Sequence, residues 1–175
     1  MLDIKKKFGQ PAGAPLPDWK PVARPPRTPL EGRHCRIEPF NVAAHGADLY
    51  NAYAENEDSS MWTYMPKSPF ANEADFLAWM GHACESEDPH FHTLIDTSTG
   101  KPVGQASYMR ITPDHGVIEV GNIAFSPKLQ RTPIATETTF LMMQRVFNEL
   151  GYRRYEWKCD SCNAPSRRAA VRLYL

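Results

Sequence analysis

The spacing of apolar residues divides the chain beyond about residue 32 into strands and helices. Alternating or dense β-branched and aromatic residues predict strands over residues 33–40, 90–96, 102–111, 117–125 and 153–159. Helical spacing predicts helices over residues 42–57, 73–86, 133–150 and 164–173. Asn72 is placed to cap the second helix, and Gly151 follows the third. This order of elements indicates an α/β domain over residues 33–175.

Residues 1–32 differ from the rest because they hold seven of the 16 prolines. Such spacing prevents a helix and disfavours paired strand. We expect an extended arm that covers its own domain, held by Trp19 and Leu30, with a mobile first stretch of about ten residues. The alternative is a Pro-rich ligand for another module.

Composition limits the functional classes. The 175 residues suit one globular domain, with 42% hydrophobic and 23% charged residues. A formal net charge of zero argues against a nucleic-acid partner, although residues 33–111 are acidic and residues 112–175 basic. No apolar run reaches the roughly 18 residues of a membrane span, and the N-terminus lacks the apolar core of a signal peptide. Four cysteines without export signals indicate reduced thiols in the cytoplasm.

The segment with the clearest chemistry is the strand, loop and helix start over residues 117–136. Thr132 is a plausible N-cap, and Pro133 suits the first helical position because no amide hydrogen is needed there. A helix start offers unpaired N–H groups and a positive dipole end, and Lys128 and Arg131 add charge. The pattern suits a phosphate or pyrophosphate. An ordinary loop with exposed basic residues remains the alternative, since no Walker glycine run is present.

Two motifs at this separation resemble the GNAT superfamily of acyl-CoA-dependent N-acetyltransferases, and within it the ribosomal-protein N-terminal acetyltransferases. The coenzyme A loop of that family, Gln/Arg-x-x-Gly-x-Gly/Ala, is matched at its ends by residues 130–135, QRTPIA. The later Asn-x-x-Ser block is matched by residues 163–166, NAPS. The resemblance covers residues 33–173 and implies a mixed, mostly antiparallel sheet with helices on both faces.

The resemblance also implies acetyl-CoA as co-substrate and names its contacts. The backbone of Ile123, Ala124 and Phe125 would pair with the pantetheine amides, and Asn163 would bond the pantetheine arm. Ser166 or Arg167 would lie near the thiol or phosphate end. The pyrophosphate would lie in the loop and helix start, against Gln130, Arg131, Thr132, Ile134, Ala135 and Thr136.

For the chemistry, the resemblance implies direct attack of a primary amine on the thioester, the acceptor being a small amine or a protein N-terminus. Glu119 matches the acidic residue of the branch's Glu-x-Gly pattern and is the candidate general base. It is alternatively a structural partner of an arginine. His92 and His115 are rival bases, because histidine titrates near neutrality.

The region before residue 66 borders the acceptor in the family. Acidic side chains there, near aromatic ones, suit a cationic amine, and a solvated helix end is the alternative. The residues concerned are Glu55, Glu57 and Asp58 with Trp62 and Tyr64. A metal site is not expected, since Cys159 and Cys162 supply at most half of one.

Three departures from the family pattern are visible. Pro133 stands where glycine is usual, which removes one amide donor and predicts weakened pyrophosphate binding. Ala170 stands where relatives place a tyrosine general acid, and Tyr174 is out of register. The sequence ends where relatives continue into two further strands, so we expect the last strands to be lacking and a sheet edge that permits a homodimer. A non-catalytic acyl-CoA-binding or regulatory module is therefore the alternative function.

Overall fold

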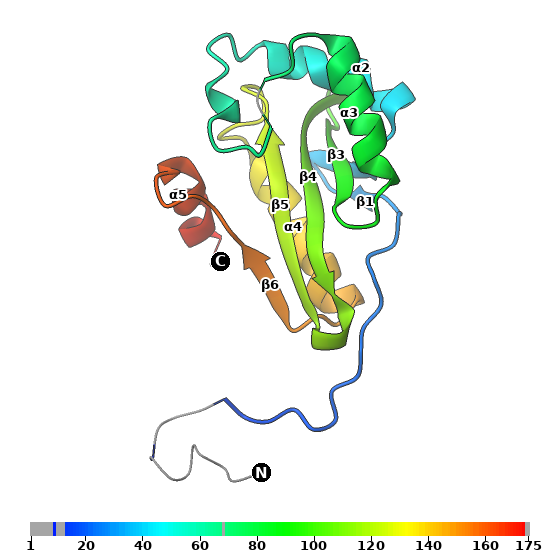
Figure 1. Ribbon diagram of the computed structural model, residues 1–175, viewed down its shortest axis with the longest axis vertical. Helices are drawn as coiled ribbons and strands as arrows, with labels where there is room; N and C mark the ends of the chain where they lie inside the picture. The colour runs from blue at the N-terminus through cyan, green and yellow to red at the C-terminus, as the bar shows by residue number, and fades with distance from the viewer. Residues whose placement is uncertain (1–8, 10–12, 68, 174–175) are drawn as a thin grey trace.

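The computed structural model describes residues 9, 13–67 and 69–173. Among these residues six strands form one sheet, in which neighbours in space are neighbours in sequence (Figure 1). They are β1 (Leu30–Glu31), β2 (Cys35–Pro39), β3 (His90–Asp96), β4 (Lys101–Thr112), β5 (Val117–Phe125) and β6 (Arg154–Trp157). Every neighbouring pair is antiparallel except β5 and β6, which run parallel. The predicted mixed, mostly antiparallel sheet is confirmed.

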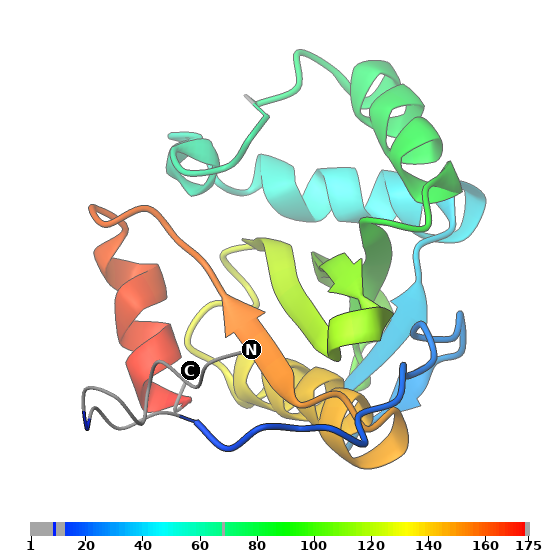
Figure 2. The same cartoon turned by 60° about the horizontal axis from the view of Figure 1, so that its bottom comes forward.

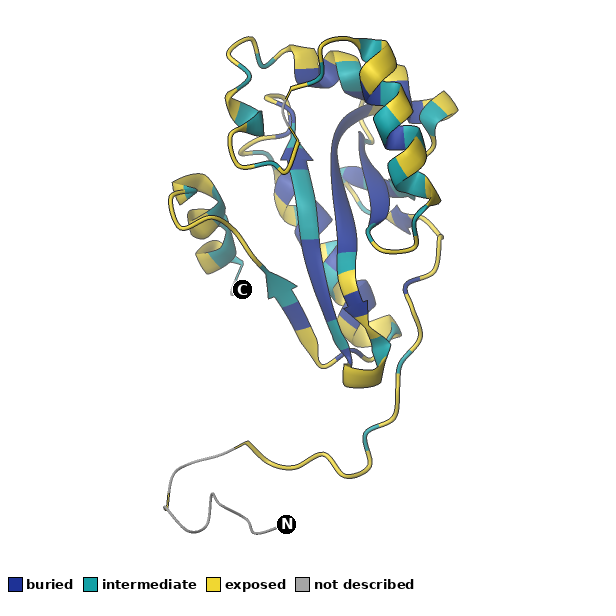
Figure 3. Ribbon diagram, viewed as in Figure 1, coloured by how far each residue is buried: buried dark blue, intermediate teal, exposed yellow. Residues whose placement is uncertain are grey.

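The helices lie on both faces of the sheet, as predicted. Helices α2 (Val42–Ala54) and α3 (Glu73–Glu85) cover one face, and α4 (Pro133–Gln144) covers the other (Figure 2). Helix α5 (Ala164–Arg172) lies beyond β6, at the edge of the sheet. Each face has its own core, one beneath α4 around Tyr108 and Met142 and one beneath α2 and α3 around Leu49 and Phe76. The central strands are buried along most of their length, whereas α5 is largely exposed (Figure 3).

Local capping explains where the helices begin and end. The predicted cap Asn72 accepts from the Asp75 amide at 2.9 Å and starts α3. Helix α2 ends at Ala54, short of the predicted residue 57, because polar side chains offer the backbone other partners. The amide of Met61 donates to Asn56 Oδ1, and this turn leads into the short helix η1 (Ser60–Trp62).

The predicted helix 133–150 is not a single α-helix. After Gln144 the chain continues as a π-helical turn, η3 (Arg145–Glu149). Two tertiary contacts coincide with this wider turn. The Tyr108 hydroxyl donates to the Met142 carbonyl at 2.8 Å, and the buried Arg145 donates to the Thr28 and Pro29 carbonyls of the arm at 2.7 and 2.9 Å. Such contacts are invisible to helical periodicity.

The Pro-rich arm runs along the domain from residue 13 to β1 without helix or strand. The Trp19 indole donates to the Asp114 carbonyl at 2.9 Å, within the connection η2 (Pro113–His115). It packs so closely on Gly116 that a Cβ there would lie 2.2 Å from the ring. Leu30 is buried in strand β1, which was not predicted because two residues are too few for a visible pattern. Most of the first ten residues, expected to be mobile, lie outside the described residues.

Glu137, in the second turn of α4, ties this helix to the turn between β1 and β2. Its carboxylate accepts from the amides of Arg33, His34 and Cys35 at 2.9, 2.6 and 2.8 Å. Burial by itself raises the pKa of this carboxyl, but the amides outweigh burial and hold it below the usual value. The orientation of the α4 N-terminus is therefore fixed by an ionised, triply bonded side chain.

Two histidines stack in the core beneath α4. His90 and His92 on β3 are 3% and 1% exposed, and their ring centroids lie 4.4 Å apart. Burial first, and then the field of nearby arginines, lowers the pKa of His90 to about 4. Burial and the neighbouring His90 lower the pKa of His92 to about 3. Both rings are therefore neutral in the folded protein near pH 7.

Acid should weaken the fold through this pair. Below pH 6.5 these histidines become protonated in the unfolded chain but stay neutral in the folded protein, because their folded-state pKa values are lower. The free energy of unfolding therefore falls from pH 6.5 towards 4. One pKa unit corresponds to about 1.4 kcal/mol, so His92→Leu should reduce this loss by roughly 1–3 kcal/mol. Urea unfolding at a series of pH values measures it. Parallel pH profiles for the variant and the parent would contradict the expectation.

Candidate functional site

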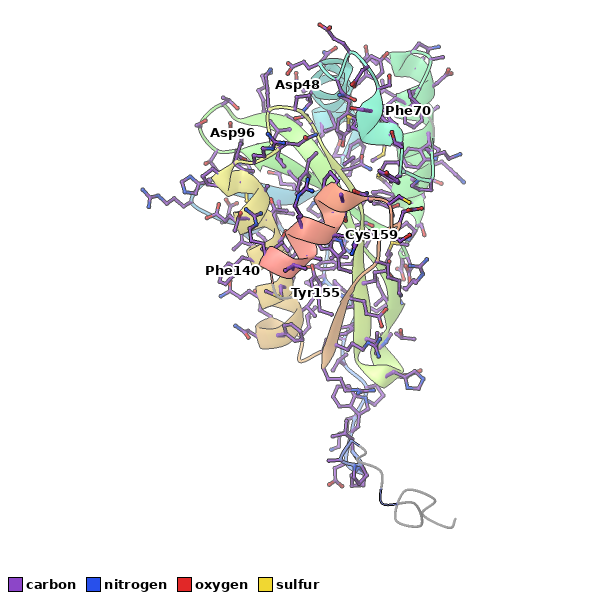
Figure 4. All side chains as sticks on the ribbon, turned by 90° about the vertical axis from the view of Figure 1, so that its left-hand side faces the viewer. Asp48, Phe70, Asp96, Phe140, Tyr155 and Cys159 are labelled. Atoms are coloured by element: carbon purple, nitrogen blue, oxygen red, sulfur yellow. The ribbon has the colours of Figure 1, made fainter. Side chains whose placement is uncertain are left out.

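A gap opens between β5 and β6 halfway along β5. The two strands pair only from Val117 opposite Arg154 to Val120 opposite Trp157. Strand β5 then continues to Phe125, while the chain leaves the sheet for a loop and α5 (Figures 1 and 4). Beyond Val120, the edge of β5 that faces this gap has no strand partner among the described residues. Backbone groups on such an edge are free to pair with a bound molecule.

A β-bulge lies at the closed end of the gap. Asn122 has a φ of 49°, and the register of β4 and β5 shifts between Gln105 and Ser107. The Asn122 side-chain amide donates to Ser107 Oγ at 2.9 Å, and Ser107 Oγ donates to the Gly121 carbonyl at 3.1 Å. Bulges re-aim backbone groups beside sites. The sequence analysis missed these residues, although the Gly-Asn pair is a recognisable signal for a left-handed residue.

Backbone alternation decides which groups of β5 face the gap. Ser126 donates to the Val103 carbonyl at 3.1 Å, so Phe125, one residue earlier, directs its N–H and C=O away from β4. Gln130 Nε2 donates to that Phe125 carbonyl at 3.0 Å. Ala124 instead pairs with β4, and its carbonyl accepts from the Tyr53 hydroxyl. Of the predicted backbone contacts, Ala124 is already paired, and Phe125 has only its N–H available because its carbonyl is bonded to Gln130.

The loop after β5 is held by its own hydrogen bonds. Leu129 is buried, and its amide donates to the Ser126 carbonyl at 3.0 Å. Lys128 forms an ion pair with Glu55 at the end of α2. Thr132 occupies the N-cap position, but its hydroxyl donates to the Leu129 carbonyl at 2.7 Å and makes no bond to the helix. The predicted N-cap residue is therefore confirmed, but its side chain makes no capping bond, because the hydroxyl donates to the loop carbonyl instead.

Uncapped amides result at the start of α4. The amides of Arg131, Thr132, Ile134 and Ala135 have no hydrogen-bond acceptor in the part of the chain that the structure describes. Pro133 supplies none, and the amide of the predicted Thr136 belongs to the helix's own first bonds. Arg131, at a φ of 61°, is exposed and forms no ion pair among these residues. Free amides at a positive dipole end suit a phosphate-like anion.

Helix α5 closes the other side of the gap, and its predicted contact residues hold that connection together. Asn163 Oδ1 accepts from the Ser166 amide at 3.1 Å, and Ser166 Oγ accepts from the Trp157 indole at 2.9 Å. Arg167 donates to the Ser161 carbonyl at 3.2 Å. The side-chain NH₂ of Asn163 has no acceptor among the described residues, so it is the polar group left for a ligand.

The candidate base Glu119 lies one residue before the point where β5 and β6 separate. It is 3% exposed, and Arg110 Nη1 lies 2.6 Å from both carboxylate oxygens. Lys158 Nζ lies 2.6 Å from Glu119 Oε2 and 2.6 Å from Glu156 Oε2. These bonds, the Glu119 bond first, raise the pKa of Lys158. Glu119 is thus an ion-paired carboxylate at the closed end of the gap. Its bond to Arg110 matches the alternative that the sequence left open, that Glu119 is a structural partner of an arginine.

The rival bases lie elsewhere. His92 is buried on the opposite face of β3 from Phe91, against Tyr108 beneath α4. Its low pKa, caused by burial, leaves it a poor proton acceptor. His115 is exposed in η2, at the end of β5 remote from the loop. Neither lies at the gap.

Most side chains of the predicted acidic and aromatic region before residue 66 already contact other groups of the protein. Trp62 packs edge-on against Tyr53 with centroids 5.5 Å apart, as part of the core beneath α2 and α3. Asp58 accepts from the Ser60 amide at 2.9 Å. Tyr64 is 46% exposed, and its hydroxyl donates to the Cys162 carbonyl at 3.1 Å, which links this region to the loop before α5. Glu57 is exposed.

Among the described residues, His, Cys, Asp and Glu form no group of three placed to hold a metal ion. Within the same residues no helix has the length and apolar character needed to cross a membrane.

Comparison with known proteins gives a consistent result. Residues 35–173 match the family model described as "Acetyltransferase (GNAT) domain". The chain is 45% identical to a solved GCN5-related N-acetyltransferase from Brucella melitensis, with a TM-score of 0.87, over 90% of this chain and 71% of that one. It is 35% identical to a solved probable acetyltransferase of the GNAT family from Chromobacterium violaceum, with a TM-score of 0.84, over 94% and 81%.

A solved ribosomal-protein-S5-alanine acetyltransferase from Vibrio fischeri shares the fold, with 16% identity and a TM-score of 0.64 over 83% of this chain and 81% of that one. No curated protein matches the chain.

Pro133→Ala should strengthen anion binding at the α4 N-terminus. The change restores one N–H donor to a turn whose other amides are free, and a bond from such a donor to a charged oxygen is worth about one order of magnitude in affinity. Calorimetric titration with inorganic pyrophosphate measures the effect, with Pro69→Ala in an exposed loop as the matched control. Equal affinities for the two variants would show that the anion does not lie against this turn.

Proposed function

Because the chain belongs to the GNAT acetyltransferase family, we propose that it transfers the acetyl group of acetyl-CoA to a primary amine, either a small amine or a protein N-terminus. The observation that carries the proposal is the gap between β5 and β6, which has an unpaired strand edge on one side and uncapped helix amides at its end. A linear molecule with amide groups and a diphosphate has complementary partners along this path.

The coenzyme contacts follow from the groups that remain free. The diphosphate is bound by the amides of Arg131, Thr132, Ile134 and Ala135, and the pantetheine amides pair with the open edge of β5 at Ile123 and Phe125. The NH₂ group of Asn163 donates to a pantetheine carbonyl from the α5 side. Ser166 and Arg167 position the loop before α5, because their own hydrogen bonds lie within that connection.

The chemical step is attack of a neutral amine on the thioester carbonyl, with the coenzyme thiolate leaving. Glu119 accepts the proton from the incoming ammonium, and the bulge at Gly121 and Asn122 directs backbone donors at the closed end of the gap. Lys158 can withdraw to Glu156 alone, since it is bonded to both carboxylates at 2.6 Å. This movement would leave Arg110 as the one cation bonded to Glu119 Oε2 and open the Lys158 side of that oxygen to the acceptor.

A non-catalytic acyl-CoA-binding module is the second candidate. It is favoured by the two cations on Glu119, which must release an oxygen before that side chain can accept a proton. The alanine at position 170, where relatives have a tyrosine acid, favours it too. Both candidates share the coenzyme site and differ only in the reaction.

Coenzyme binding is tested by thermal unfolding with acetyl-CoA and with desulfo-CoA. At about 100 times the Kd a ligand stabilises the folded state by about 2.7 kcal/mol, which raises the Tm by roughly 5–10 °C. We expect a rise with both ligands, because the contacts involve the nucleotide and pantetheine rather than the thiol. The absence of a shift with either ligand would rule out both candidates.

Glu119→Gln separates the enzyme from the binding module. Removing a general base lowers the rate about a hundredfold or more, while the Tm shift with desulfo-CoA stays the same. Thiol release over a panel of amines and peptide N-termini measures the rate. Glu38→Gln on β2 is the matched control, because Glu38 is also ion-paired and partly buried but far from the gap. Full activity in Glu119→Gln would remove Glu119 as the base.

A further inference from the structure

A cavity lies at the end of the sheet remote from the α4 N-terminus. It has a volume of about 180 Å³ and is lined by the arm, the segment after α3, the start of β3 and the end of β4. Its lining residues are Arg24, Pro25, Arg27, Glu87, His90 and Ile111. None of these residues takes part in the proposed acetyl transfer.

His90 is the unusual member of this lining. The side chain is buried, yet its ring nitrogens have no hydrogen-bond partner within the described residues. Nε2 is completely shut off from solvent beside His92, whereas Nδ1 is not among the fully buried atoms and belongs to a residue that lines the cavity. Nδ1 is therefore the ring nitrogen left to contact a ligand in the cavity, and such a contact would give this buried side chain a polar partner.

The cavity is electropositive at His90. Arg24 and Arg27 on the arm and the buried Arg145 on η3 all act on this ring in the direction that disfavours its charged form, in addition to burial. His92, stacked on it from the same strand, is neutral. The ring therefore shares the cavity lining with two guanidinium groups, and no carboxylate among the described residues bonds to it.

The guanidinium groups of Arg24 and Arg27 on the arm each have N–H donors that are not used in hydrogen bonds within the described residues. Arg24 Nη2 donates to the Glu87 carbonyl at 3.2 Å, and Arg27 Nη2 donates to the Ser86 carbonyl at 2.8 Å. A guanidinium has five N–H donors, so each retains several. These bonds hold the two side chains against the end of α3, on one wall of the cavity.

The neighbouring carboxylates do not neutralise the pair. The Glu87 side chain is 81% exposed, and its carboxylate lies 4.0 Å from Arg24. Asp88 lies 3.9 Å from Arg24, but its oxygens accept from the amides of Arg110 and Ile111 at 2.8 Å each. Asp88 therefore fastens β4, and the lining is left with an excess of positive charge.

We propose that this cavity binds a small oxyanion, a phosphoryl, sulfuryl or carboxylate group, with Arg24 and Arg27 as charged donors and His90 as the third polar contact. Arginine pairs are well suited to such groups because their planar forks can bond two oxygens at once. A bound anion would fasten the arm to the end of α3 and the start of β3. Both of these elements are distant from the arm in the sequence.

The binding test follows the His90 ring by NMR while sulfate or succinate is added at constant ionic strength, with chloride as the balancing salt. We expect saturable shifts of the His90 signals, and the tighter of the two anions identifies the head group. The variant Arg24→Gln with Arg27→Gln should weaken binding roughly tenfold or more. Both arginines are exposed, so the fold tolerates the change. Arg172→Gln on α5 is the control and should bind like the parent. Equal binding by the double variant, or no saturable shift, would overturn the proposal.

A second measurement is independent of affinity. An anion beside the imidazole stabilises its charged form, so saturating sulfate should raise the His90 titration midpoint above about 4, and the double variant should lose this rise. A midpoint that sulfate leaves unchanged would equally overturn the proposal. Since no step uses acetyl-CoA, neither result depends on the proposed transferase function.

Discussion

The short pairing of β6 with β5 is the constraint on which the site depends. The two parallel strands share hydrogen bonds over four residue pairs and then separate, so the second half of β5 keeps one edge unpaired. Each free N–H and C=O on that edge must find another partner, because unpaired backbone groups are costly when shielded from water. The bulge at Asn122 marks the point where the strand turns from pairing with its neighbours to presenting its backbone.

Around the gap, the side chains hold the loop and helix in place, and the free backbone amides are the groups available to a ligand. Lys128, Gln130 and Thr132 each bond to a group of the protein itself, and Glu137 fastens α4 to the β1–β2 turn. The amides after Arg131 are the groups left over. A site made in this way tolerates sequence change at its side chains. This explains how Pro133 can replace the family's glycine at a cost of one donor, because its fixed φ suits the first helical position.

Glu119 shows how one side chain can serve stability and chemistry together. Its burial at 3% exposure is tolerable because Arg110 and Lys158 compensate the charge. In the proposed reaction the same pair would orient the carboxylate towards an incoming ammonium. Lys158 is shared between Glu119 and Glu156, so it could bond to Glu156 alone and leave Arg110 as the cation that holds Glu119.

The sequence by itself determined most strands and helices. In these parts of the chain the apolar spacing favours a helix or a strand, and Asn72 and Pro133 favour the start of a helix. It also placed the loop and Asn163 in one family pattern, because those features depend on neighbours along the chain. The tertiary structure alone decided that Ala124 pairs with β4 while Phe125 faces away from it and bonds to Gln130 through its carbonyl. It also decided that Thr132 bonds to Leu129 and that Glu119 meets Arg110 and Lys158. It likewise decided the π-helical turn at Arg145 and the cavity at His90. Each of these results depends on which hydrogen-bond partner or charge comes within reach, and contacts between residues up to 117 positions apart carry no signal in local spacing.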